Sequence, residues 1–190
     1  LGETLSLLDE CRSLGWSFGQ DFTALCFSAI LAYRVLPRLS DCPTIDRYLR
    51  SSLMASSNYP FWPAVDGGDS VLPQDAVNEP ELYDEVIAGL SDADLPKVLE
   101  NNYVAWAESI AMQRIDAIVS NLHRGAYRRA AIVLVALAER LLAEGHRHDS
   151  IELIARYRTK YNRHRAFKAE LAVVLGQSAL APLHTENGAS

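Results

Sequence analysis

The sequence predicts an all-α protein of antiparallel helical hairpins, arranged as a solenoid or as an irregular bundle of six to seven helices. Three observations lead to this prediction. Leu and Ala dominate the 190 residues while Gly is sparse and long β-branched runs are missing, which favours helices. Apolar residues recur at three- and four-residue steps through most of the chain. Prolines and glycines stand between these periodic stretches, where helices end.

The first 57 residues are expected to form an N-terminal helical segment. Gly15 ends the first helix, and Asp21 caps the second, which stops at Pro37. The second helix is apolar over most of its circumference, so we expect it to be largely buried. Pro43 lies in the first turn of the third helix, whose Arg47 points outward. The three helices are expected over 3–14, 21–36 and 42–57.

Residues 58–80 break the helical pattern and are predicted to form a loop or linker. Four prolines and the pair Gly67-Gly68 occur here without helical or alternating periodicity. A loop of this length is usually functional or disordered. Asp66 and Asp69 lack the further oxygen ligands of a calcium loop, so a solvated turn is expected. We therefore place the boundary between an N-terminal and a C-terminal helical part here.

Residues 81–176 are predicted to form a C-terminal helical-hairpin region. The link at 146–150 is short, which implies that its flanking helices pack as an antiparallel pair. Asp149 or Ser150 is expected to cap the last helix, which is expected to run unbroken to Gly176. Residues 177–190 are expected to be a flexible tail. The helices are expected over 81–89, 95–122, 126–144 and 150–176.

Composition argues against several classes of protein. Cys11, Cys26 and Cys42 are too few and too widely spaced for a disulfide framework or a zinc site, so we expect free thiols in the reducing cytoplasm. The longest apolar run, 130–138, is too short to span a bilayer, and no secretory signal is visible. No phosphate loop, nucleophile elbow or HExxH motif occurs. We expect no cofactor, no metal and no membrane association.

Charge is unevenly distributed along the chain. Residues 1–100 carry 16 acids and 6 bases, a net of −10, whereas residues 101–190 carry 12 bases and 8 acids, a net of +4, which together give the overall −6. Such an asymmetry can mark an anionic partner for the basic half. It can equally mark two halves that pack against each other, and we favour this second interpretation.

The basic residues concentrate on the predicted helix 151–171. On an unbroken helix Arg156, Lys160 and Arg163 share a face, and Arg158, Arg165 and Lys168 lie on a flanking strip. This surface could neutralise phosphates of a nucleic acid, although the acidic overall charge argues against a dedicated nucleic-acid binder. The alternative is a solvated helix face. The candidate anion-binding residues are Arg128, Arg156, Lys160, Arg163, Arg165 and Lys168.

One stretch resembles a known kind of region. Tyr127 is followed after two residues by Ala130-Ala131, and a later helix ends in a basic run, an aromatic residue and a Leu. These ending residues are Lys160, Tyr161, Arg163, His164, Arg165, Phe167 and Leu171. Over about residues 100–172 the pattern resembles the C-terminal helical-repeat region of bacterial proteins often found with SWIM-type zinc fingers. The resemblance implies a helical-repeat fold and no known reaction. The zinc-binding Cys/His cluster is absent, so metal binding is not carried over.

A second resemblance concerns Arg158 and His164. Their spacing resembles the Arg, four-to-six residues, His signature of HEPN ribonucleases, in which the two residues serve RNA cleavage, usually across a dimer interface. His164 would act as general acid or base while Arg158 steadies the phosphorane charge. On an unbroken helix, however, the two side chains point about 120° apart.

The sequence thus favours a non-enzymatic α-helical interaction module of a larger bacterial protein, with a protein partner. The alternative function is a nucleic-acid-binding module or a HEPN-like ribonuclease that uses the basic helix.

Overall fold

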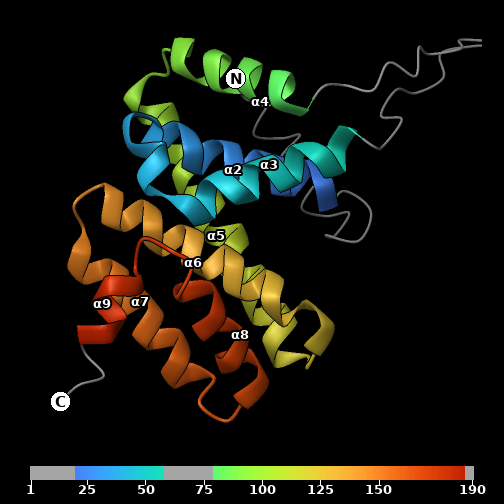
Figure 1. Ribbon diagram of the computed structural model, residues 1–190, viewed down its shortest axis with the longest axis vertical. Helices are drawn as coiled ribbons and strands as arrows, with labels where there is room; N and C mark the ends of the chain where they lie inside the picture. The colour runs from blue at the N-terminus through green and yellow to red at the C-terminus, as the bar shows by residue number, and fades with distance from the viewer. Residues whose placement is uncertain (1–19, 58–78, 187–190) are drawn as a thin grey trace, which may run out of the picture.

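The structure, a computed structural model, describes residues 20–57 and 79–186, and these residues form an all-α bundle. Within these ranges there are eight α-helices, two short 3₁₀ helices and no strand, which confirms the predicted fold class (Figure 1). The predicted helix 3–14 and most of the predicted loop 58–80 lie outside the described residues. The elements are α2 (Gln20–Val35), η1 (Leu36–Asp41), α3 (Pro43–Ser57), α4 (Glu79–Asp92), α5 (Lys97–Ser120), η2 (Arg124–Ala126), α6 (Tyr127–Ala143), α7 (Arg147–Lys160), α8 (Arg165–Leu175) and α9 (Ala181–Glu186).

Helix α6 is the centre of the bundle. It packs against α2, α3, α5, α7 and α8, and 11 of its 17 residues are buried (Figure 1). Its alanines, including Ala130, Ala131 and Ala138, carry so little side chain that neighbouring helices can approach on several sides. The helices therefore surround α6 instead of stacking one after another. The sequence left open a solenoid or an irregular bundle, and the structure is an irregular bundle.

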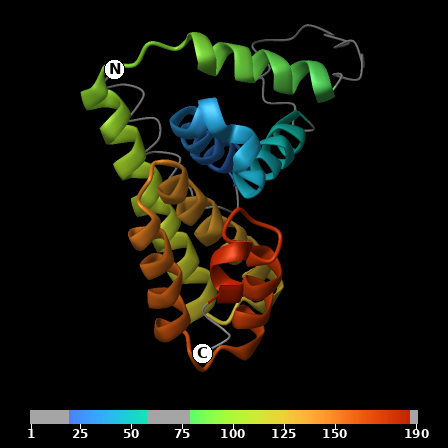
Figure 2. The same ribbon diagram turned by 60° about the vertical axis from the view of Figure 1, so that its left-hand side comes forward.

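The helices on either side of residues 58–78 share one hydrophobic core. Helices α2 and α3 form a hairpin, and both also pack on α6. Phe27 and Ile45 from this hairpin belong to the same buried cluster as Leu134 of α6 and Phe167 of α8. Helix α4 lies across the α2–α3 hairpin at the end of the bundle opposite the turn between α7 and α8 (Figure 2).

The predicted unbroken helix 150–176 is wrong. It is two helices, α7 and α8, joined by a turn in which Tyr161 leaves helical geometry at φ −109° and ψ 36°. On an unbroken helix Lys160, His164 and Lys168 would fall on the same stripe as the buried Tyr157. Breaking the helix keeps both lysines exposed while Phe167 returns to the core.

The start of this region also differs from the prediction. Helix α7 begins at Arg147, so neither Asp149 nor Ser150 is its cap. Ser150 is fully buried instead, and its hydroxyl donates a hydrogen bond to the carbonyl oxygen of Ala138 at 2.7 Å. This bond fixes α7 to α6, two helices that pack as the predicted antiparallel pair.

The predicted flexible tail is packed on the bundle over its first part. Leu180 is fully buried, and the backbone N–H of Ala179 donates to the Glu139 carboxylate at 3.0 Å. This packing was not predictable from a local pattern, because the stretch after Gly176 has no long apolar period. Residues 187–190 lie outside the described residues.

Candidate functional site

In the structure the predicted anion-binding residues lie in three separate places. Arg163 is no longer on the helix that carries Arg156 and Lys160, so the predicted common face of these three is wrong. Arg156 lines a pocket beside α5, and Lys160 Nζ pairs with Asp116 Oδ2 at 2.7 Å. Arg128 lines a different groove, beside α3. The other four bases of the predicted basic helix are exposed around the turn between α7 and α8. We call this group the basic turn; it consists of Arg158, Arg163, Arg165 and Lys168.

The basic turn is not neutralised by the acidic half of the chain. In the part of the chain that the structure describes, none of its four side chains forms an ion pair. The ion pairs between distant helices are made instead by Arg34, Arg140 and Lys160. Within the described residues, then, packing of the two halves does not account for these four charges.

Tyr161 faces the interior, and His164 packs against it. Tyr161 is buried, and its hydroxyl donates to Asp116 Oδ1 at 2.7 Å. The half-buried His164 ring meets the Tyr161 ring edge-on, with centroids 5.2 Å apart. Its Nδ1 atom is buried and makes no hydrogen bond within the described residues.

The HEPN-like pair is arranged differently from the sequence expectation. Arg158 is exposed on α7, whereas His164 precedes the first residue of α8, so the angle expected on one unbroken helix does not apply. Neither side chain lines the pocket between α5, α6 and α7 or the groove between α3, α6 and the end of α8. Their catalytic role stays a prediction.

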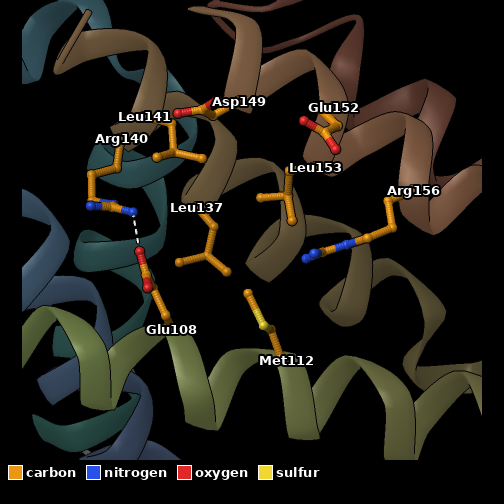
Figure 3. A pocket seen from close by; sticks show the side chains of 9 residues that line it. All are labelled: Glu108, Met112, Leu137, Arg140, Leu141, Asp149, Glu152, Leu153 and Arg156. Atoms are coloured by element: carbon orange, nitrogen blue, oxygen red, sulfur yellow. Dashed lines mark hydrogen bonds and ion pairs between the residues drawn. The ribbon is translucent and has the colours of Figure 1, made fainter. Parts of the chain in front are cut away.

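A pocket of about 230 Å³ opens between α5, α6 and α7 (Figure 3). Its floor is apolar and comes from all three helices. Met112 projects from α5 toward Leu137 of α6 and Leu153 of α7, and Leu141 lies beside them (Figure 3). Leu137 and Leu153 are buried core residues, so the floor is a rigid part of the bundle.

Charged side chains form the rim of this pocket. At one end Glu108 pairs with the buried Arg140. Along α7, Asp149 and Glu152 are 57% and 69% exposed, and Arg156 points toward the space above Met112 (Figure 3). The rim thus carries three carboxylates and two guanidinium groups. The guanidinium of Arg140 is already engaged in ion pairs.

Among the residues that line this pocket, Arg156 is the only one that the sequence indicated as a candidate binding residue. One signal was present in α5, where Glu108, Met112 and Asp116 follow one another at four-residue steps along one face. All three are half-buried, as expected for residues at the edge of a groove. The apolar stripe of α5 alone did not indicate that a pocket would remain between α5 and α7.

In the described ranges no group of three or more His, Cys, Asp or Glu residues could hold a metal ion. None of the helices described is long and apolar enough to cross a membrane. Cys26 is half-buried and the free thiol of Cys42 is buried, whereas Cys11 lies outside the described residues. Burial, followed by the charges of Glu139 and Asp41, raises the pKa of the Cys42 thiol to about 12.

Comparison with known proteins finds no match: no protein-family model, no curated protein and no solved structure is similar to the chain. The resemblance to the helical-repeat region associated with SWIM-type zinc fingers therefore stays a prediction, and function has to be argued from the geometry.

Proposed function

We propose that the protein is a non-enzymatic α-helical interaction module that binds a peptide segment of a partner protein in the pocket between α5, α6 and α7. The observation that carries this proposal is an apolar floor surrounded by a mainly acidic rim. A partner segment with one large apolar side chain next to a Lys or Arg would match both features. The free thiol of Cys42 supports a cytoplasmic location.

The size of the pocket fits one apolar side chain. A buried cavity of about 150 Å³ is enough to bind benzene, and this pocket measures about 230 Å³. An aromatic or large aliphatic side chain can therefore enter between Met112 and Leu153. Anchors of this kind, seated in a preformed pocket, dominate the energy of many protein interfaces.

The charge of the rim selects the residue next to the apolar anchor in the partner peptide. Arg140 is already paired with Glu108 and Glu144, which leaves Arg156 as the rim base without an ion pair among the described residues. Asp149 and Glu152 each lie near a histidine, at 3.6 and 3.8 Å, but these histidines carry charge only when protonated. The α7 side of the rim carries two carboxylates and one permanently charged base, Arg156, and this balance favours a basic neighbour of the anchor.

Selection from a random peptide phage library tests this function. We expect enriched peptides to share an apolar residue next to Lys or Arg. Met112→Arg should weaken their binding by at least about tenfold, because the long side chain fills the pocket and repels the basic neighbour. Val173→Arg, at an exposed position of α8, is the matched control and should leave binding unchanged. Enriched peptides that bind wild type and Met112→Arg equally would contradict the proposal.

A second candidate function, nucleic-acid binding, is supported by the unpaired charges of the basic turn. Four exposed bases in a short segment can contact successive phosphates. We expect labelled single-stranded RNA or DNA to bind at low salt, with an affinity that falls steeply as salt rises and that Arg163→Gln with Arg165→Gln weakens. No affinity at low salt would rule this function out. RNA cleavage abolished by His164→Ala, but retained by the surface control Asn162→Ala, would support the ribonuclease alternative.

A further inference from the structure

A second groove, separate from the proposed peptide pocket, lies between α3, α6 and the end of α8. Its volume is about 180 Å³. Arg47 reaches it from α3 and Arg128 from α6, so two guanidinium groups from different helices line the same small space. Ile132 and Val174 provide an apolar wall. The groove therefore combines a positively charged edge with an apolar surface.

The two arginines are available to a ligand. Arg47 Nη1 donates to Gln177 Oε1 at 3.1 Å, a bond that orients the guanidinium and leaves its other N–H groups unused. Arg128 is exposed. Neither residue forms an ion pair within the residues that the structure describes. Each can offer two parallel N–H donors to a phosphate or carboxylate.

The surrounding charges reinforce this positive character. Tyr48 lines the groove; burial raises the pKa of its hydroxyl, and the charges of Arg114 and Arg129 lower this pKa in part. Burial, and next the charge of Arg129, lower the pKa of Arg114. The electrostatic surroundings of Tyr48 therefore include two guanidinium groups besides those of Arg47 and Arg128 that line the groove.

The buried carboxylate of Glu139, which binds Thr44 of the groove, does not compete for the arginines. Glu139 lies behind Thr44, and its oxygens accept hydrogen bonds from the backbone N–H groups of Thr44, Ile45 and Ala179 and from the Thr44 hydroxyl. The Ser51 hydroxyl donates to the carbonyl oxygen of Tyr48. Because these hydroxyl protons are already used, the guanidinium groups are the main donors for a ligand.

We propose that this groove is a binding site for a small organic anion, with its phosphate or carboxylate group held between Arg47 and Arg128 and its apolar part against Ile132 and Val174. The site is independent of the peptide pocket and of the basic turn. It assigns to Arg128 a role different from that of the other predicted anion-binding residues.

Titrations of the full chain with three probes test the proposal: phenyl phosphate, benzoate and inorganic phosphate. The affinity is measured by calorimetry, and the rise in melting temperature with ligand gives an independent measure. We expect at least one of the two organic anions to bind, and inorganic phosphate to bind several-fold more weakly because it lacks the apolar part. Binding of phenyl phosphate alone would assign the site to phosphate esters, and binding of benzoate alone to carboxylates.

Substitutions show whether binding occurs in the groove. Arg47→Gln and Arg128→Gln should each weaken the affinity about tenfold or more, while Arg158→Gln in the basic turn should not. If a Gln variant is unfolded, the corresponding Lys variant retains the charge and should still lose affinity, because it cannot form the paired N–H contacts. The proposal is wrong if neither organic anion binds at millimolar concentration, if inorganic phosphate binds as tightly, or if Arg158→Gln weakens binding as much.

Discussion

At the scale of single residues, Glu139 shows how one buried charge fixes the packing of distant segments. It lies fully buried on α6, and Thr44 Oγ1 donates to its Oε1 at 2.7 Å. The Thr44 and Ile45 backbone N–H groups at the start of α3 donate to Oε2 at 2.9 and 3.1 Å. These N–H groups have no partner within their own helix, so Glu139 caps α3 from another helix. The N–H of Ala179 is held by the same carboxylate.

Glu139→Gln is predicted to destabilise the protein by about 1–3 kcal/mol, because the amide nitrogen would face N–H donors. Burial raises the pKa of Glu139 above its ordinary 4.5, and the hydrogen bonds from Thr44, Ala179 and Ile45 lower it only in part. The native carboxyl therefore keeps its proton to higher pH than the unfolded one. The stabilisation from the protonated form is complete below pH 4.5 and is lost as pH rises through the native pKa.

Urea unfolding measured from below pH 4.5 to neutral pH checks this sign. The advantage of wild type over Glu139→Gln should shrink as pH rises. Glu85→Gln, an exposed position on α4, should show no comparable trend. A wild-type advantage that grows with pH would mean that the four donors lower the pKa of Glu139 below that of the unfolded chain.

At the scale of elements, the turn between α7 and α8 decides where the basic residues lie. Both helices pack on α6. Tyr161 anchors the turn, since its ring lies 5.8 Å from that of Phe167 and its hydroxyl binds Asp116 of α5. The ring of Phe167 in turn meets Tyr127 edge-on. An aromatic cluster thus holds the turn without a Gly or Pro in it.

Tyr161→Phe is predicted to lower the free energy of unfolding by about 1–2 kcal/mol, because it removes a hydrogen bond to a charged group while keeping the aromatic packing. Asp116 retains its pair with Lys160, which limits the loss. Chemical denaturation measures the effect, with exposed Asn162→Ala in the same turn as the control. Equal stability of Tyr161→Phe and wild type would show that the aromatic packing alone holds the turn.

At the scale of the whole molecule, a chain of ion pairs joins the segments on either side of residues 58–78. Arg34 of α2 binds Glu100 of α5 and Glu144 after α6, with Nε 2.7 Å from Glu144 Oε1. Arg140 binds the same Glu144 at 2.9 Å and also Glu108 of α5. Because these side chains are mostly buried, their pairing is screened less by salt than that of surface pairs.

Arg140→Ala is predicted to destabilise the protein by about 3–5 kcal/mol, because it leaves carboxylates without their partner in a site where Arg140 is only 5% exposed. Arg158→Ala, which removes an exposed arginine, should change stability by no more than about 0.5 kcal/mol. Thermal and urea unfolding of both variants provide the comparison. A loss for Arg140→Ala as small as that of the control would mean that the network contributes only surface-like pairing.

The sequence by itself determined the all-α class and the approximate positions of α2, α3, α5 and α6, because helical periodicity and helix-ending residues are local signals. Only the tertiary structure decided the remaining features. The break after Lys160 depends on how Tyr161 and Phe167 pack against α5 and α6. Glu139 meets a residue 95 positions away, and the groove between α3, α6 and α8 is formed by helices distant in sequence. Such contacts carry no local period, so no pattern along the chain could predict them.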